Sequence, residues 1–351
     1  MSGINLGGWF SQIDAIEEKN PQNFPGIDAH IDSFLSVEDF ARIKKWGFSH
    51  VRLPVDWYNL FDAQVNPIAG RLSRLDSAVA NLLSAGLEVI LDLHRCPGHN
   101  FESAVREAQS FFTDPTLRRD CLKVWAVLAE RYGSLPKVAL ELLNEPVAPN
   151  NDIWNEVKDE LAREIRRLAP KATLVIGSNL WNQAPQFAGL TPVDDDNVQY
   201  SFHLYSPLVF THQNAPWMFG DAYYQSRVYP GSYDLTGEPD GIKIDHGNWN
   251  KSRLHDLIAP VFKFRETYQV KVACDEFGVY MGGPDRVSQM AWIQDCLELF
   301  RENQIGWTYW NYKNLDFGLV SKGEQLFNKH PPYDNSERTD FGLLGILQKF
   351  S

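Results

Sequence analysis

The stretch LELLNEPV, residues 140–147, ends an apolar run on an amide, a carboxylate and a proline: Asn144, Glu145 and Pro146. The apolar part is typical of a β-strand that is buried on both faces, and a proline cannot continue such a strand. A turn would explain Asn144 and Pro146, but a carboxylate that ends a buried strand is costly to keep charged without a partner. The stretch therefore predicts a strand end that presents Glu145, either in an ordinary turn or as a catalytic acid.

This strand is one of several short apolar strands that alternate with amphipathic helices. The predicted strands cover residues 4–9, 50–55, 87–94, 138–144, 173–178, 198–205, 271–277 and 306–310. The predicted helices cover residues 37–46, 72–85, 115–132, 153–168, 252–268 and 287–303, and a last helix follows residues 341–344. Such repeated units without a change of composition predict the α/β class and a single (β/α)8 TIM barrel. We expect residues 1–351 to form this one catalytic domain.

One interval, from residue 205 to about residue 251, has no helical periodicity. Its aromatic residues are Phe210, Trp217, Phe219, Tyr223, Tyr224, Tyr229, Tyr233 and Trp249. A connection of this length is in most cases functional or disordered, and disordered segments contain few aromatic residues. We therefore expect a long, ordered, aromatic-rich loop after the sixth strand. In one interpretation this loop borders a cleft, and in the other it has only a structural role.

Composition excludes several classes of function. Acidic residues outnumber basic ones by 45 to 33, for a formal net charge of −12, and no Lys/Arg stripe provides the surface that binds nucleic acid. No apolar run reaches the roughly 18 residues of a membrane span, and no signal peptide is evident. We expect a soluble monomer that acts on a neutral substrate, either in the cytoplasm or secreted with its signal removed.

The sequence offers little to a metal ion or cofactor, and we expect neither. The four cysteines lack CxxC spacing and are expected to pack as small apolar residues, as neither a disulfide framework nor a zinc ribbon is indicated. The run DDDN at residues 194–197 does not have the spacing of an EF-hand loop. It predicts a solvated acidic turn, with a calcium site as the alternative.

Polar residues collect at the carboxyl ends of the predicted strands, which is the catalytic face of a (β/α)8 barrel. Each has a structural explanation when it is taken singly, such as a buried ion pair, a core histidine or ring packing. Glu145 and Glu276 are harder to explain in this way, because two unpaired carboxylates at buried strand ends are costly. The set comprises Arg52, Asp92, His94, Asn144, Glu145, His203, Tyr205, Glu276 and Trp310.

Two facing carboxylates with different neighbours indicate glycoside hydrolysis. One stays protonated to donate to the leaving oxygen, and the other stays charged to attack the anomeric carbon. If Arg52 and Tyr205 reach Glu276, they would hold it ionised, and Glu145 would then be the proton donor. Asn144 is placed to bind a sugar hydroxyl beside the scissile bond, and the ring of Trp310 would provide a flat face for the sugar.

The motifs GINLGGW, VRLP, LDLH, LNEP, FHLY, DEFG and YWNYK, in this order, resemble glycoside hydrolase family 5 from residue 3 to about residue 317. The motif LNEP alone is moderately specific, and the ordered set is strongly so. The resemblance implies a (β/α)8 fold and a retaining mechanism with Glu145 as acid/base and Glu276 as nucleophile. It implies that the remaining active-site positions of the family are Arg52, His94, Asn144, His203, Tyr205 and Trp310.

Two further resemblances limit the range of expected substrates. The stretch YSPLVFTHQNAPW, residues 205–217, resembles bacterial endo-β-1,4-glucanases, which implies a cellulase with Trp217 among the substrate-binding residues. Glucomannan and mixed-linkage glucan would be side substrates. The stretch GGWF, residues 7–10, resembles exo-acting β-glucanases, so an exo-β-1,3-glucanase or β-glucosidase stays open, as does a β-mannanase.

Two other classes of protein compete with a glycosidase. In a metal-dependent barrel hydrolase, the ligands could come from DAHID, residues 28–32, but such sites need two histidines on the first strand, which has none. A chelator would inactivate that hydrolase and spare a glycosidase. A non-catalytic carbohydrate-binding barrel could use the same aromatic residues, but it has no need of both Glu145 and Glu276.

Overall fold

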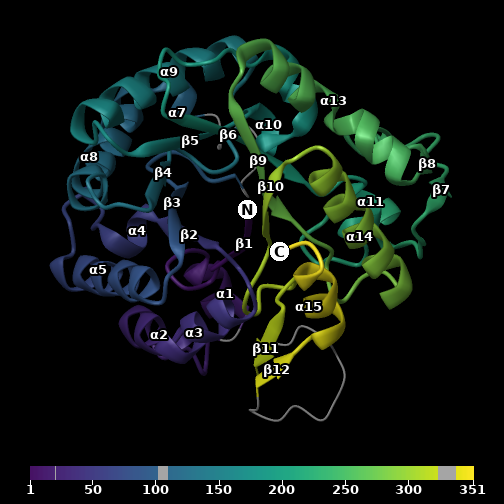
Figure 1. Ribbon diagram of the computed structural model, residues 1–351, viewed down its shortest axis with the longest axis horizontal. Helices are drawn as coiled ribbons and strands as arrows, with labels where there is room; N and C mark the ends of the chain where they lie inside the picture. The colour runs from purple at the N-terminus through teal and green to yellow at the C-terminus, as the bar shows by residue number, and fades with distance from the viewer. Residues whose placement is uncertain (20, 102–109, 323–336) are drawn as a thin grey trace.

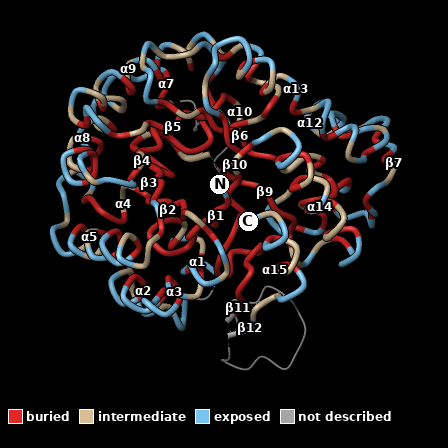
Figure 2. The backbone as a smooth tube through the Cα atoms, in the orientation of Figure 1, coloured by how far each residue is buried: buried red, intermediate tan, exposed pale blue. Residues whose placement is uncertain are grey.

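The computed structural model describes residues 1–19, 21–101, 110–322 and 337–351. Its centre is a closed barrel of parallel strands in the order β1-β10-β9-β6-β5-β4-β3-β2, with helices around it (Figure 1). The barrel strands are β1 (Ser2–Asn5), β2 (His50–Asp56), β3 (Glu88–Arg95), β4 (Val138–Glu141), β5 (Thr173–Gly177), β6 (Val198–Leu204), β9 (Lys271–Phe277) and β10 (Gly306–Tyr309). Figure 2 shows buried residues along the barrel and exposed ones on the outer side of the helices. The predicted (β/α)8 barrel is confirmed.

The long helices of the outer layer lie within a few residues of their predicted positions. They are α3 (Val37–Lys45), α5 (Ala69–Ser84), α8 (Pro115–Tyr132), α9 (Asn151–Leu168), α13 (Lys251–Tyr268) and α14 (Arg286–Glu302). Side-chain caps explain where four of them begin, because Asp114, Asn150, Asn250 and Asp285 each accept a hydrogen bond from a backbone N–H of the first turn. The last helix, α15 (Phe341–Gln348), starts at Phe341 and not after residue 344, since Asp340 caps it.

Shorter helices and strands lie between the barrel strands and the long helices along the chain. The short helices are α1 (Ile13–Lys19), α2 (Ile27–Phe34), α4 (Trp57–Leu60), α7 (Ser110–Thr113), α10 (Asn179–Asn182) and η1 (Ala184–Gly189). A two-stranded sheet is formed by β11 (Val320–Lys322) and β12 (Glu337–Thr339).

Two predicted strands are too long. The first ends at Asn5 and not at residue 9, because the chain turns at Gly8, whose φ is 86°. The fourth ends at Glu141 and not at residue 144. Beyond it the Leu142 N–H still donates to Val175 O, and the Asn144 N–H donates to Leu93 O at 3.1 Å. The chain therefore stays between its neighbours without a regular ladder as it approaches the catalytic face.

The segment between β6 and α13 is ordered and rich in aromatic residues, as predicted, but it is not without secondary structure. It contains α11 (Leu208–Thr211), η2 (Asp221–Tyr224), α12 (Asp240–Lys243) and an antiparallel pair, β7 (Gly231–Tyr233) and β8 (Gly247–Trp249). Five of its aromatic side chains are buried: Phe210, Tyr223, Tyr229, Tyr233 and Trp249. Tyr229 donates to Asp295 Oδ2 of α14 at 2.7 Å, and Trp292 Nε1 donates to Ser206 O. These two hydrogen bonds tie the segment to α14, and the five buried rings belong to the apolar core of the protein.

Candidate active site

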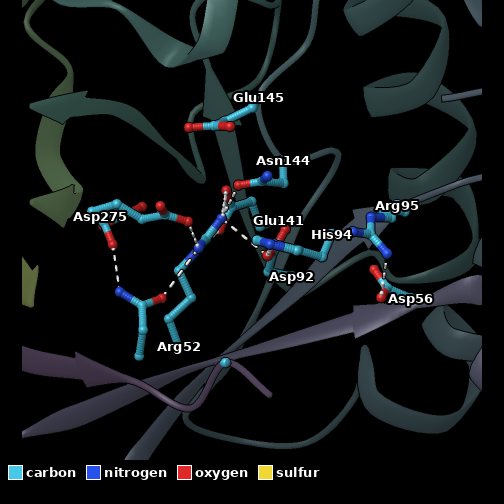
Figure 3. A network of polar contacts seen from close by, with 12 residues as sticks. Arg52, Asp56, Asp92, His94, Arg95, Glu141, Asn144, Glu145 and Asp275 are labelled. Atoms are coloured by element: carbon cyan, nitrogen blue, oxygen red, sulfur yellow. Dashed lines mark hydrogen bonds and ion pairs between the residues drawn. The ribbon is translucent and has the colours of Figure 1, made fainter. Parts of the chain in front are cut away.

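Arg52, fully buried in β2, contacts side chains of four other strands, β1, β3, β4 and β9. In β1, Asn5 Oδ1 accepts from Arg52 Nη1 at 3.1 Å. The Nε and Nη2 atoms of Arg52 donate to the two oxygens of Glu141 at 2.6 and 2.8 Å. Nη1 donates to Glu276 Oε1 at 2.5 Å, and Nη2 donates to Asn144 Oδ1 at 2.7 Å and lies 3.0 Å from Asp92 Oδ2. Figure 3 shows Asp92, Glu141 and Asn144 around the Arg52 side chain. The planar fork of an arginine therefore fixes an amide and several carboxylates at once.

The carboxylates around Arg52 outnumber the cation, and burial disfavours their charged forms. Burial raises the pKa of Glu141 and of Asp275 to about 8 and that of Asp92 to about 7, against the attraction of Arg52. Asp275 is the extra residue of a β-bulge, because Cys274 pairs with Phe202 of β6 and Glu276 pairs with the next residue. Burial therefore favours the neutral forms of these carboxyl groups in the barrel interior beneath the site, and Arg52 favours their charged forms.

Glu276, at the end of β9, accepts a hydrogen bond on each carboxylate oxygen. Oε1 accepts from Arg52, and Oε2 accepts from the Tyr205 hydroxyl at 2.9 Å. Arg52 and Tyr205 therefore both reach Glu276. Burial nevertheless raises the pKa of Glu276 above its ordinary value, and Arg52, His94 and the Tyr205 hydrogen bond oppose that shift. The ionised form of Glu276 therefore depends on these neighbours.

Glu145 lies opposite Glu276 on a turn with an unusual backbone. Its φ of 44° is in the left-handed region, which costs a residue with a Cβ about 1–2 kcal/mol. Such strain is often found at functional sites. Glu145 Oε1 lies 2.8 Å from His203 Nδ1, and the same nitrogen is 3.6 Å from Glu276 Oε2. One oxygen of Glu145 and one of Glu276 lie within 4.8 Å of each other, and Figure 3 shows Glu145 extending above the Arg52 network.

Asn144 combines one bonded and one unbonded amide atom. It is fully buried, and its Oδ1 accepts from Arg52. Among the described residues, its Nδ2 has no hydrogen-bond acceptor. A buried donor without a protein partner calls for an explanation, and its place beside Glu145 suits a group on a substrate.

His94 and Trp310 form one side of the site. His94 Nδ1 lies 2.7 Å from Asp92 Oδ2, and its ring is parallel to that of Trp310, with an interplanar angle of 5° and centroids 5.7 Å apart. A Cβ at Gly7 would lie 2.6 Å from the Trp310 ring, so only glycine permits this approach. Trp310 is 6% exposed. Glycine and histidine thus hold the indole in place at the end of β10.

Trp217 lies at the edge of the site, apart from the polar network. It is 36% exposed, and its ring packs against Tyr280 at a centroid distance of 5.2 Å. Phe317 connects it to the centre, because the Phe317 ring contacts both Trp217 and Tyr205. Lys19 Nζ lies 5.6 Å from the Trp217 ring centroid and 3.1 Å from Asp316 Oδ2. Three loops of the catalytic face thus meet at this ring.

A second buried ion pair lies beyond His94. Arg95 Nη1 is 3.3 Å from Asp56 Oδ2 and 3.0 Å from Asp14 Oδ1. Burial raises the pKa of Asp56 to about 7, in spite of Arg95. Figure 3 shows Arg95 and Asp56 beside the main network. This pair ties the ends of β2 and β3 together.

The structure brings all the predicted strand-end residues to one face of the barrel, with Trp217 at its rim. Sequence reasoning missed Asn5, Glu141, Asp275 and also Asn182, whose Nδ2 lies 3.2 Å from His203 Nε2. The charge of Glu141 inside the apolar run LELL was a signal for a buried partner. Asp275 and Asn182 had none, because their positions depend on a bulge and on a turn.

The possible metal ligands of DAHID are not brought together. Asp28 and Asp32 pair with Arg71 and Arg74 of α5, and His30 Nε2 faces Gly8 O. Within the described part of the chain, Glu145, His203 and Glu276 are a trio whose donor atoms could reach a single ion. All four cysteines are buried. In the same part of the chain no helix is both long and apolar enough to cross a membrane.

Comparison with known proteins assigns the chain to one family. The model of the cellulase family, glycosyl hydrolase family 5, matches residues 15–316. Endoglucanase C of Acetivibrio thermocellus is 33% identical over 334 residues, which cover 92% of this chain and 93% of that protein. A glucan 1,3-beta-glucosidase of Blumeria graminis is 32% identical over 363 residues, 89% of this chain and 82% of that protein. The structure of Thermotoga maritima Cel5A in complex with cellobiose has the same fold, with a TM-score of 0.74 at 24% identity over 99% of this chain and 96% of that one.

Proposed function

Since the chain belongs to the cellulase family, glycosyl hydrolase family 5, we propose that this O-glycosyl hydrolase is a retaining endo-β-1,4-glucanase. The observation that carries the proposal is the separation of at most 4.8 Å between an oxygen of Glu145 and one of Glu276. Retaining glycosidases hold their two carboxyl groups about 5–5.5 Å apart, whereas inverting ones need about 6.5–9.5 Å to admit a water molecule.

In the first step Glu276 is the nucleophile. Its carboxylate attacks the anomeric carbon, a bond forms between that carbon and a Glu276 oxygen, and the bond to the leaving oxygen breaks. Glu145 gives its proton to that oxygen, so that the leaving sugar departs as an alcohol. The hydrogen bonds of Arg52 and Tyr205 to Glu276 support this role, because they favour its charged form.

In the second step Glu145, now ionised, acts as the base. It takes a proton from a water molecule, whose oxygen attacks the anomeric carbon as the bond to Glu276 breaks. Two inversions leave the configuration of the product unchanged. His203 stays close to both carboxyl groups, with Nδ1 at 2.8 Å from Glu145 Oε1 and 3.6 Å from Glu276 Oε2.

The remaining residues are proposed to bind the sugar that is cleaved. The Nδ2 atom of Asn144 is a buried donor beside Glu145 and suits a sugar hydroxyl, a contact that strengthens in the transition state. Trp310 offers its ring to the apolar face of a pyranose, and His94 orients that ring. Trp217 is proposed to contact a more distant sugar unit, because it lies at the rim and is partly exposed.

The relatives support β-glucan as the substrate. The similarity to endoglucanase C over nearly the full length of both chains supports internal cleavage. The similarity to a glucan 1,3-beta-glucosidase favours a second candidate, an exo-acting β-1,3-glucanase.

One experiment tests the substrate and the stereochemistry together. We expect carboxymethyl cellulose and lichenan to be cut first into long fragments, with laminarin and an aryl β-glucoside cleaved slowly and glucomannan at an intermediate rate. Proton NMR of the first product should show the β-anomer, as retention requires. Early release of glucose from laminarin would instead establish the exo-acting candidate, and an α-anomer would exclude the two-step mechanism.

A further inference from the structure

His203 is held between Glu145 and a side chain from a neighbouring strand end. Its Nδ1 lies 2.8 Å from Glu145 Oε1, and its Nε2 lies 3.2 Å from Asn182 Nδ2. Burial lowers the pKa of His203 well below its usual range, and Arg52 and His94 lower it further. The ring is therefore neutral and carries one N–H, on either Nδ1 or Nε2. The position of this proton decides whether His203 Nδ1 donates a hydrogen bond to Glu145 or accepts one from it.

The turn that carries Asn182 is strained. Leu180, Trp181 and Asn182 all have positive φ, at 49°, 61° and 54°, although none is a glycine. The backbone holds this geometry because the Trp181 N–H donates to Pro146 O and its Nε1 donates to Phe101 O at 3.1 Å. A strained turn fastened to the residue that follows Glu145 indicates a position under functional constraint.

The Asn182 side chain occupies space that is free because residue 177 is a glycine. A Cβ at Gly177, the last residue of β5, would lie 2.2 Å from Asn182 Oδ1 and 2.4 Å from Nδ2. Asn182 is fully buried. A glycine on one strand end and three left-handed residues after it thus hold an amide against the back of His203.

We propose that Asn182 is a positioning residue for the acid step, which acts through His203. Its amide N–H donates to His203 Nε2 and so keeps the ring proton on Nδ1. That N–H binds Oε1 of Glu145, which leaves Oε2 to carry the proton for the leaving oxygen. With the proton on Nε2, the bare Nδ1 would instead accept the acidic proton of Glu145 and turn it away from the substrate. This inference rests on the proposed role of Glu145.

The leaving-group dependence of Asn182→Asp tests the proposal. The new carboxylate would draw the ring proton to Nε2. With aryl β-cellobiosides, kcat/KM reports formation of the glycosyl-enzyme, and a leaving group such as 2,4-dinitrophenolate needs no proton. We expect kcat/KM to fall about tenfold or more for phenyl cellobioside, part of the roughly 10²–10⁴-fold that acid–base catalysis contributes. It should change less than about threefold for the dinitrophenyl compound. An equal loss across the series would overturn the proposal.

A matched control lies on the same turn. Asn179 is also a buried amide, but it exchanges hydrogen bonds with the backbone of Ala148 and does not touch His203. We expect Asn179→Asp to leave the leaving-group dependence unchanged, whatever it does to stability. If it steepens the dependence as much as Asn182→Asp does, the effect belongs to the turn as a whole and the proposal is wrong.

Two further variants separate the inference from the proposed function. Gly177→Ala would displace the Asn182 amide without changing its chemistry, and it should steepen the dependence in the same direction. Glu145→Gln should show the steepest dependence of all. If kcat/KM of Glu145→Gln does not depend more strongly on the leaving group, the acid role of Glu145 is refuted. If Glu145→Gln shows the stronger dependence but Asn182→Asp and Gly177→Ala do not, only the inference about Asn182 is refuted.

The tautomer can also be measured directly in the unmodified protein, and a variant is needed only to assign the His203 signals. Long-range 1H–15N NMR distinguishes a protonated ring nitrogen from a bare one, and the His203 signals are those lost in His203→Gln. We expect a protonated Nδ1 and a bare Nε2. A proton on Nε2 would overturn the proposal.

Discussion

At the level of single residues, Glu276 is held by a cation on one oxygen and a hydroxyl on the other, and burial works against its charge. Glu145, in contrast, has a neutral histidine as its partner. This difference in surroundings supports the opposite roles that we propose for these two similar carboxyl groups.

Replacing the proposed nucleophile should abolish turnover and preserve the fold. For Glu276→Gln we expect kcat to fall on the order of 10⁴-fold or more, as happens when other hydrolases lose their nucleophile. The neutral amide avoids a buried charge, so Tm measured by calorimetry should stay the same or rise. Substantial remaining activity would remove Glu276 from this role.

The Tyr205 hydroxyl should set the acidic limit of activity. As the proposed nucleophile, Glu276 must be ionised to attack, so kcat/KM is expected to fall as the pH drops through its pKa, which burial raises above the ordinary value. Tyr205→Phe deletes a hydrogen bond that favours the carboxylate, so the pKa rises further and the acid limb of the kcat/KM profile moves to higher pH. An unchanged acid limb, with the alkaline limb as internal control, would contradict this account.

Trp310 should matter more for the substrate than for the fold. For Trp310→Ala we expect kcat/KM on a cello-oligosaccharide to fall about 10–100-fold, because a stacking face worth a few kcal/mol is lost. Chemical denaturation should show a smaller relative change, although truncation of a buried ring also costs stability. A pure loss of stability with unchanged kcat/KM would assign the ring to the core.

At the level of elements, the bulge in β9 places Asp275 next to Glu276 inside the barrel. A group that is protonated in the folded state and ionised in the unfolded state destabilises the fold as pH rises. Asp275, with a folded pKa of about 8, therefore favours folding at low pH, and this contribution is lost between about pH 4 and pH 8.

Asp275→Asn should make stability less dependent on pH. The amide imitates the protonated carboxyl group in size and remains neutral at every pH. We expect the free energy of unfolding, measured with urea, to decline less between pH 5 and pH 9 than in the unmodified protein. Glu88→Gln on the exposed start of β3 is a matched control that should leave the pH profile unchanged. A steeper decline in Asp275→Asn would show that Asp275 is charged when folded.

The elements also show how far local patterns can be interpreted. Strand β9 and helix α8 begin and end where the sequence predicts, since an apolar run and a Pro/Gly pair mark their limits. The predicted ends of β1 and β4 are wrong, because the sequence stays apolar beyond the last hydrogen-bonded residue of each strand. The elements between Tyr205 and Lys251 are only three or four residues long, too short for periodicity to reveal.

At the level of the whole molecule, the segment after β6 shares the core of the barrel. Its buried tyrosines and Trp249 belong to the same apolar cluster as the strands, and Tyr229 is hydrogen-bonded to α14. We therefore propose that the chain works as one catalytic domain. Differential scanning calorimetry should give one transition whose calorimetric and van't Hoff enthalpies agree, and size-exclusion chromatography should give a monomer. Two transitions would indicate that the segment unfolds separately.

The amino-acid sequence by itself determined the number of barrel strands, their order along the chain and which of them lead into Glu145 and Glu276. These features follow from local periodicity and from the cost of a charge in a buried strand. Only the tertiary structure decided which carboxylates share Arg52, how close the two glutamates lie and which nitrogen of His203 faces Glu145. Those depend on closure of the barrel, which brings β2, β4, β6 and β9 to one centre from positions far apart in the chain.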